Sequence, residues 1–173
     1  VTLYYLRRFL KFWELRFGET SLENLDIAEE IMEHLEHSHS IFAENQEFLA
    51  SGFSDEQRYL ITRALGEAGA QYRLSVYKNS FSGKRTTVQT SSLRDFMSLA
   101  IKYVDHSIRK NRREDGLYHA YNLISFKGER MIIRHLYEML EGQVAALSSG
   151  YLSTKESLDV LDALKASRMF RED

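Results

Sequence analysis

The side chains best suited to chemistry gather in one short segment, residues 111–122. This segment holds two carboxylates, a histidine, two tyrosines, two adjacent arginines and asparagine side chains. Carboxylates can transfer protons, polar side chains can donate or accept hydrogen bonds, and aromatic rings offer flat apolar faces. The combination is suited to sugar recognition, with Glu114 or Asp115 as the acid. The side chains expected to shape such a sugar site are Arg113, Tyr118, His119, Tyr121 and Asn122.

The same segment also has a purely structural interpretation. Asp115-Gly116 is an ordinary turn signal, and the neighbouring arginines and carboxylates could form a surface ion-pair cluster. Residues 117–126 alternate and are rich in aromatic side chains, which is typical of a half-buried strand. Two hypotheses therefore stay open for residues 111–122: a sugar site, or a turn followed by a strand.

One short motif in this segment resembles a known group of proteins. Asp115-Gly116-Leu117-Tyr118, placed after an expected helix and before Tyr121-Asn122, is similar to loops of bacterial carbohydrate-active proteins built on an (α/α) toroid. That group includes glycoside hydrolases and phosphorylases whose helix-end loops carry acidic catalytic residues. The resemblance covers about a dozen of the 173 residues. Hydrolysis of this class uses two carboxylates, so the partner of Glu114 or Asp115 would have to come from elsewhere.

A second cluster of potential ligands lies in residues 29–39. It contains Glu29, Glu30, Glu33, His34, Glu36, His37 and His39. On a helix, spacings of three and four residues put such side chains on one face, as a helical metal site requires. A di-iron bundle needs a further Glu-x-x-His pair and glutamates on facing helices, and the chain has no such second pair elsewhere. We therefore interpret the cluster as a solvated acidic face and expect no cofactor, and a metal-dependent helical bundle that uses this helix stays open as a third hypothesis.

The elements that must position these side chains follow from the hydrophobic periodicity. Spacings of three and four residues predict a first helix with a wide apolar stripe, and capping boxes begin at Ser54 and Ser153. A polar loop with a short strand at 86–88 is expected before the helix that leads to residues 111–122. Met131-Ile132-Ile133 fits either a second strand or the start of a helix. The expected helices are 2–17, 22–49 with a kink near 38–40, 55–79, 92–111, 134–148 and 154–170.

These elements predict a mainly α fold of about six helices packed as antiparallel hairpins. One small β excursion is expected near 117–133. We expect residues 1–173 to form a single helical domain. Because the chain starts at Val1 rather than Met and stops without a helix terminator, we expect it to be a fragment of a longer protein.

Composition narrows the classes of function. The chain has no cysteine, which excludes disulfides, thiolate metal sites and a cysteine nucleophile. A net charge of -2 disfavours a dedicated nucleic-acid binder, and no apolar run approaches the roughly 18 residues of a membrane span. Basic residues on the first helix (Arg7, Arg8, Lys11, Arg16) are interleaved with aromatics. We interpret them as side chains that extend to solvent around a packed face.

The function expected from these observations is that of a helical, non-catalytic binding or assembly domain of a larger bacterial protein. Its partner would be the rest of the parent chain or a second copy, not nucleic acid or a membrane. The alternative is part of a carbohydrate-active enzyme that acts on glycosidic bonds, with Glu114 or Asp115 as acid. The lack of cysteine and of a signal-peptide pattern slightly favours the cytoplasm.

Overall fold

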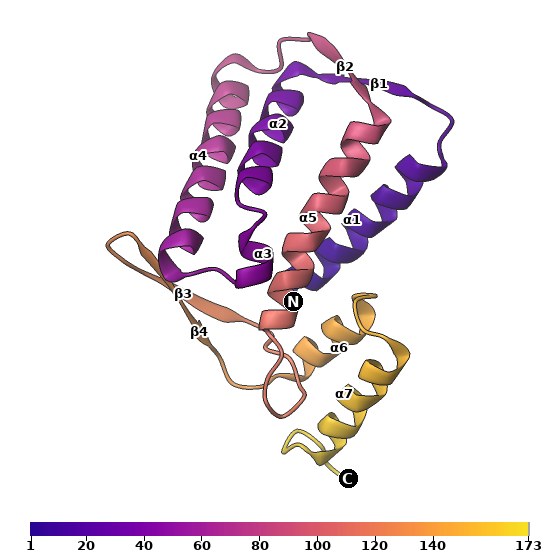
Figure 1. Cartoon of the computed structure of the whole chain (residues 1–173), viewed down its shortest axis with the longest axis vertical. Coiled ribbons are helices and arrows are strands. Elements are labelled where there is room, and N and C mark those ends of the chain that lie inside the picture. Colours follow the sequence, from indigo (N-terminus) through magenta and orange to yellow (C-terminus); the bar gives the residue numbers. More distant parts are fainter. Residues whose placement is uncertain (173) are drawn as a thin grey trace. The chain divides into compact units, whose positions relative to one another are not determined.

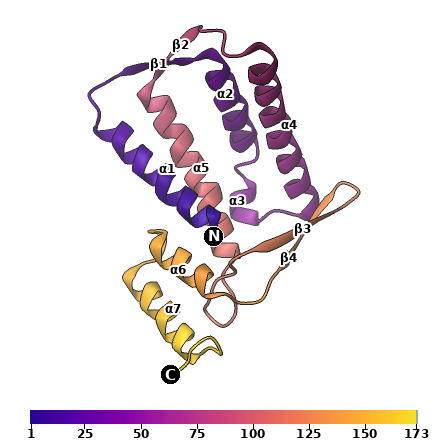
Figure 2. The same ribbon diagram turned by 180° about the vertical axis from the view of Figure 1, so that it is seen from behind.

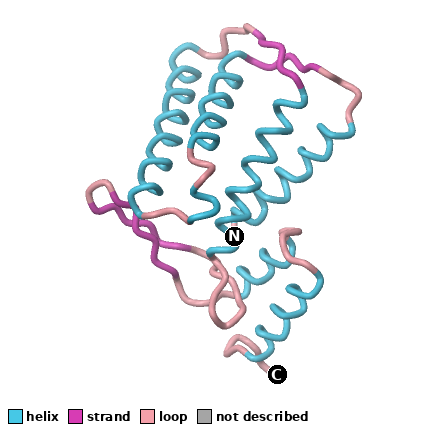
Figure 3. The backbone as a smooth tube through the Cα atoms, in the orientation of Figure 1, coloured by secondary structure: helices cyan, strands magenta, loops and turns pink. Residues whose placement is uncertain are grey.

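The computed structural model describes residues 1–172, and it is mainly helical, with 62% of the chain in helices (Figures 1 and 3). The mainly α fold class is therefore confirmed. The described residues contain two small antiparallel sheets, each of two strands. The helices are α1 (Thr2–Glu19), α2 (Glu29–Glu44), α3 (Phe48–Ser51), α4 (Asp55–Asn79), α5 (Thr90–Lys110), α6 (Leu140–Ser148) and α7 (Thr154–Ala166). The strands are β1 (Asn24–Ala28), β2 (Arg85–Gln89), β3 (Asn122–Lys127) and β4 (Arg130–His135).

The chain divides into two compact units that each draw on distant parts of the sequence. Unit 1 consists of Val1–Phe12, Ile101–Ser125 and the residues from Ile133 onward. Unit 2 consists of Trp13–Ala100 and Phe126–Ile132. Within residues 1–172 no helix combines the length and the apolar character that a bilayer span requires.

In unit 2, helices α2 and α4 form an antiparallel hairpin through the short helix α3 (Figures 1 and 2). Helix α4 begins as predicted, because Ser54 and Gln57 form a complete capping box. The two glycines within α4 differ in their surroundings. A Cβ on Gly69 would lie 4.0 Å from Cε1 of His34 on the neighbouring helix α2, whereas a Cβ on Gly66 would meet no atom within 4 Å. The ring of His34 stacks on Tyr72 of α4 at 5.1 Å.

The start of the helix predicted for 22–49 is wrong, because residues 24–28 form strand β1. It pairs antiparallel with β2 in a register that joins Asn24 to Gln89 and Ala28 to Arg85. The sheet continues at its end, where the Thr90 amide donates to the Glu23 carbonyl at 2.9 Å. About sixty residues separate the two strands, so local periodicity could not reveal the pairing that outweighs helix propensity here. The short strand expected at 86–88 is confirmed within β2.

The second sheet, β3–β4, is the β excursion expected near 117–133, although its details differ. The strand begins only at Asn122, and residues 113–121 form a loop before it. The helix predicted from residue 134 is wrong at its start, because β4 continues to His135 and α6 begins at Leu140. Gly128 has φ +58° at the turn, a left-handed conformation that favours glycine. Pairing with β3 therefore determines the conformation of residues 130–135.

The core of unit 1 forms around the second half of α5. Ile101, Val104 and Ile108 of the predicted apolar stripe are buried there. Helices α6 and α7 form a hairpin, and α7 begins at the predicted Ser153–Glu156 capping box. A Cβ on Gly142 of α6 would lie only 2.9 Å from Cβ of Ala120, so α6 approaches the 111–122 loop closely. Unit 1 thus contains the whole segment that the sequence marks as chemically interesting.

Candidate functional site

The 111–122 segment folds back on itself directly after α5. The Asn111 amide donates to carbonyls of the last turn of α5 at 3.0–3.1 Å, and an isolated β-bridge joins Arg112 to Tyr118. Within the turn, the Arg113 amide donates to the Leu117 carbonyl at 2.8 Å. Gly116 has φ +83°, which a side-chain-bearing residue adopts only with strain. The predicted turn is therefore present, and it determines where the polar side chains lie.

Arg113 and Asp115 form the central ion pair of this turn. The Nε and Nη2 atoms of Arg113 donate to both carboxylate oxygens of Asp115 at 2.7–3.1 Å. The Leu117 amide also donates to Oδ1 of Asp115, at 3.1 Å. The hydrogen bond from Arg113 lowers the pKa of Asp115, so its carboxyl group is ionised near neutral pH. An ionised carboxylate is an acceptor, and this geometry suits Asp115 to holding the turn rather than to donating a proton.

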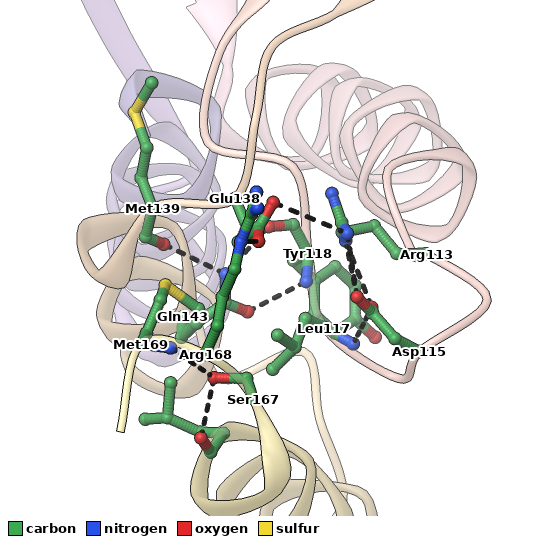
Figure 4. A network of polar contacts seen from close by, with 11 residues as sticks. Arg113, Asp115, Leu117, Tyr118, Glu138, Met139, Gln143, Ser167, Arg168 and Met169 are labelled. Carbon is green, nitrogen blue, oxygen red and sulfur yellow. Dashed lines mark hydrogen bonds and ion pairs between the residues drawn. The ribbon is translucent and has the colours of Figure 1, made fainter. Parts of the chain in front are cut away.

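A second carboxylate extends the ion pair into a network across unit 1 (Figure 4). Glu138, just after β4, lies 3.8 Å from Nη2 of Arg113 and accepts a hydrogen bond from Nε of Arg168 beyond α7. The hydrogen bond from Arg168 lowers the pKa of Glu138. The network therefore joins three segments that are distant in sequence: the turn after α5, the segment before α6 and the end of α7.

Tyr118 is part of the core. Tyr118 is only 2% exposed, and its ring packs edge-on against the ring of Tyr4, with the two ring centroids 6.4 Å apart. Its backbone is held by the fully buried Gln143 of α6, which accepts from the Tyr118 amide at 2.8 Å and donates to its carbonyl at 2.9 Å. Burial raises the pKa of the Tyr118 hydroxyl. The buried ring of Tyr118 contributes to packing and offers no face to a ligand in solvent.

His119 stacks on His135 at the end of β4. The ring centroids are 3.9 Å apart and the planes differ by 7°. Burial lowers the pKa of His119 most, and the neighbouring charges of His135 and Arg113 lower it further. Nδ1 of His119 is buried and has no hydrogen-bond partner among the described residues. The neutral form of His119 is therefore favoured in the folded protein.

Asn122 orients the second ring of this pair. Its Nδ2 donates to Oδ1 of Asn111 at 2.9 Å, which leaves Oδ1 of Asn122 as the acceptor facing Nδ1 of His135 at 2.8 Å. An amide oxygen only accepts, so Nδ1 of His135 carries the proton and Nε2 of neutral His135 has the lone pair. The structure therefore unites Asn111, His119, Asn122 and His135 in one cluster.

The two remaining predicted side chains lie at the surface. Glu114 is exposed beside the Arg113–Asp115 pair. Tyr121 is 44% exposed, and its carbonyl accepts from the Leu136 amide at 3.3 Å. Tyr137, which directly follows Leu136, is 68% exposed. Of the seven predicted residues, Arg113 and Asp115 form one group, His119 and Asn122 another, Tyr118 lies in the core, and Glu114 and Tyr121 face solvent.

Sequence reasoning missed several residues on which this arrangement depends. Gln143 and Arg168 have no distinctive sequence context, because each acts on a segment at least 25 residues away. The three-residue spacing of His135 and Glu138 fits one helical face, but His135 ends strand β4 and Glu138 lies before α6. The signal that could have indicated their environment is the β-branched pair Ile132-Ile133, which follows closely after the Lys127-Gly128 turn.

The Glu/His cluster of 29–39 does not converge on one point. Glu33, Glu36 and His37 are exposed on α2, while His34 packs on Tyr72 and His39 lies near Phe96. Glu30 accepts from the Ser82 amide at 2.7 Å. Across residues 1–172, no three histidine, aspartate or glutamate side chains are grouped so that they could hold a metal ion.

Comparison of the chain with known proteins assigns it to no family, because no protein-family model and no curated protein matches it. The similarity of Asp115–Tyr118 to toroid loops therefore rests on those residues alone.

Proposed function

We propose that the chain is a helical, non-catalytic binding or assembly domain of a larger protein. The polar side chains of the 111–122 segment support this proposal, because internal contacts employ most of them. Asp115 is ion-paired, Tyr118 is buried, and Asn122 bonds to Asn111 and His135. Groups that hold a turn and two helices together are suited to a scaffold.

The observation that carries the proposal is the set of half-exposed apolar side chains on α6 and α7, which we call the apolar surface of α6–α7. Leu140 and Val144 of α6 are 55% and 52% exposed and lie four residues apart, on one helical face. Leu158 and Leu161 of α7 are 57% and 49% exposed and lie three residues apart. Large apolar side chains that gather at an exposed surface mark sites of protein contact. We therefore assign this surface to a protein partner, which is either a second copy or another part of the parent protein.

The experiment is to place charge on this surface. We compare wild type with the double variant Leu158→Glu/Leu161→Glu by light scattering coupled to gel filtration, and by binding of a hydrophobic dye to the folded protein. Wild type is expected to self-associate or to bind the dye, and the double variant to do neither. Leu60→Glu/Leu74→Glu is the matched control, because it makes the same change at leucines of α4 that are 52% and 55% exposed. A monomeric wild type that binds no dye would overturn the proposal.

A specific observation also favours the carbohydrate alternative, namely the exposed tyrosines next to the Tyr121–Leu136 hydrogen bond. Tyr121 and Tyr137 are 44% and 68% exposed, and aromatic faces with nearby polar groups suit a sugar ring. In this alternative Glu114 is the better candidate acid, since Arg113 keeps Asp115 ionised. The other carboxylate of a hydrolytic pair would lie outside residues 111–122.

This alternative is tested by thermal unfolding in the presence of oligosaccharides and sugar phosphates. A ligand that binds the folded state raises the unfolding temperature by mass action. The shift should vanish in Tyr121→Ala/Tyr137→Ala and persist in Tyr77→Ala, which removes a tyrosine that is 81% exposed on α4. No shift with any sugar at millimolar concentration would argue against carbohydrate binding.

A further inference from the structure

We propose that His119 and His135 form an acid-sensitive contact that holds the segment before β3 to the end of β4 near neutral pH and releases it on acidification. This histidine pair belongs neither to the apolar surface of α6–α7 nor to the exposed tyrosines. It is a conformational device within unit 1.

The geometry of the pair sets a limit on its charge. The ring centroids are 3.9 Å apart and the rings are nearly parallel, with 7° between the planes. Two neutral imidazoles stack favourably at this distance, whereas two imidazolium ions repel each other. The stacked pair therefore tolerates one added proton better than two. Because the charge of histidine changes between pH 5 and 8, acidification within this range adds those protons.

Both rings are connected to the backbone that would move. The His119 amide donates to the Asn111 carbonyl at 2.9 Å, and the Tyr4 hydroxyl donates to the His119 carbonyl at 3.4 Å. His135 is held through Asn122, the first residue of β3. Between these two anchors, the Leu136 amide donates to the Tyr121 carbonyl at 3.3 Å. Separation of the rings would therefore strain the Tyr121–Leu136 hydrogen bond directly.

Burial and the surrounding charges together determine how readily His119 accepts a proton. Burial lowers the pKa of His119 most, and the charges of His135 and Arg113 lower it further, while a backbone hydrogen bond to Leu136 and the charge of Asp115 raise it. Two further charges lie on adjoining segments. The amino group of Val1 donates to the Ala120 carbonyl at 2.8 Å, and Glu138 lies 3.8 Å from Arg113. Burial and the neighbouring cations thus outweigh Leu136 and Asp115, and the pKa of His119 is lowered.

The direction of the pH effect follows from linkage. A histidine whose pKa is lowered by folding binds fewer protons in the folded state than in the unfolded state. Its stabilising contribution is present above the ordinary value of 6.5, and it is lost as the pH falls below that value toward the lowered pKa. Release is therefore expected on the acid side of neutrality.

The test uses the full chain and follows the imidazole Cε1–H signals by NMR between pH 8 and 4.5. We expect His119 to titrate below 6.5 in wild type and at a higher pH in His135→Gln, because that variant removes the neighbouring positive charge that lowers the pKa of His119. His37→Gln, which replaces an exposed histidine of α2, should leave His119 unchanged. Identical His119 titration in wild type and His135→Gln would overturn the proposal.

Amide hydrogen exchange of wild type provides a second measurement that needs no variant. After correction for the intrinsic pH dependence of exchange, protection of the His119 and Leu136 amides should fall severalfold between pH 7.5 and 5.5. The Tyr118 amide, bound to buried Gln143, serves as the internal reference and should keep its protection. Protection that stays constant at all three amides would equally overturn the proposal.

Discussion

The side-chain amide of Gln143 forms hydrogen bonds with both backbone polar groups of Tyr118. Oε1 of Gln143 accepts from the Tyr118 amide at 2.8 Å, and Nε2 of Gln143 donates to the Tyr118 carbonyl at 2.9 Å. The side chain of Gln143 thereby joins α6 to the 111–122 loop by the same pair of hydrogen bonds that a neighbouring strand would make. Its Nε2 also donates to the Met139 carbonyl at 3.0 Å, one turn earlier along the chain. Because Gln143 is fully buried, no water can replace these contacts.

Replacement of Gln143 by leucine should therefore be costly. Gln143→Leu has similar size but leaves the amide and the carbonyl of Tyr118 buried without partners, and each unsatisfied group costs about 1–3 kcal/mol. We expect the free energy of unfolding to fall by about 2–5 kcal/mol, measured by urea denaturation. Val144→Ala, next to it but half exposed, is the control and should cost less than about 1 kcal/mol. Equal losses in the two variants would contradict the structural role of Gln143.

Two helical glycines should respond in opposite ways to alanine. Gly142→Ala would place a Cβ 2.9 Å from Cβ of Ala120 and 3.1 Å from its backbone, so the clash should destabilise the protein by about 1–3 kcal/mol. Gly66→Ala meets nothing within 4 Å, and it should stabilise α4 by about 0.5–1 kcal/mol through helix propensity. Thermal unfolding of both variants checks this. If Gly142→Ala were also stabilising, the close approach of α6 to the loop would be wrong.

The half-buried ion pair between Arg7 and Asp105 should matter more than an exposed pair on the same helix. Arg7 Nε lies 2.5 Å from Oδ1 of Asp105, with side-chain exposures of 12% and 29%, and Arg7 also donates to the Ser149 carbonyl at 3.1 Å. Asp105→Asn removes the charge that compensates buried Arg7, and we expect a loss of about 1–3 kcal/mol in urea denaturation.

Glu19→Gln is the control for this pair, since Arg16 and Glu19 are 53% and 60% exposed. Exposed pairs contribute about 0–1 kcal/mol, so the change should be small. A loss for Glu19→Gln as large as that for Asp105→Asn would show that burial does not govern these contacts.

Asp115 should give the protein a distinct sensitivity to acid. Because the hydrogen bond from Arg113 lowers the pKa of Asp115, its stabilising contribution is present above the ordinary value of 3.8 and is lost as the pH falls below it. Asp115→Asn should lower the free energy of unfolding by about 0.5–1 kcal/mol at pH 7, a modest effect because the carboxylate is 46% exposed.

The pH profile distinguishes this role from a general loss of stability. Urea denaturation at pH 7, 5 and 3 should show that Asp115→Asn loses less stability on acidification than wild type does. Glu114→Gln, its exposed neighbour, should follow the wild-type profile at all three values. If the Asp115→Asn and wild-type curves run parallel down to pH 3, the ion pair contributes no linked stability.

Much of the helical architecture could be predicted because its signals are local. The stripe Leu93, Ile101, Val104 and Ile108 repeats at the helical period and is buried in α5. Ser54–Gln57 and Ser153–Glu156 satisfy the first amides of α4 and α7 within four residues, so the capping boxes are readable from sequence alone. The turn at Asp115-Gly116 is local in the same way.

For the candidate site at residues 111–122, the sequence predicted which kinds of side chain are present but not how they are arranged. That residues 111–122 combine acids, bases and aromatic rings is visible in the sequence, and so is the turn. That Tyr118 is buried whereas Tyr121 is 44% exposed depends on the approach of α6, with Gln143 and Gly142, which no spacing within the segment indicates.

Local sequence patterns were enough to predict the mainly helical class, the helix starts at Asp55 and Thr154, and the segment in which the polar side chains gather. These features depend on interactions between residues a few positions apart, which periodicity and capping report. Only the tertiary structure decided that residues 24–28 pair with 85–89 and that His119 stacks on His135. The pairing and the stacking gain their free energy from groups brought together by folding, and a linear pattern carries no record of which distant segments will meet.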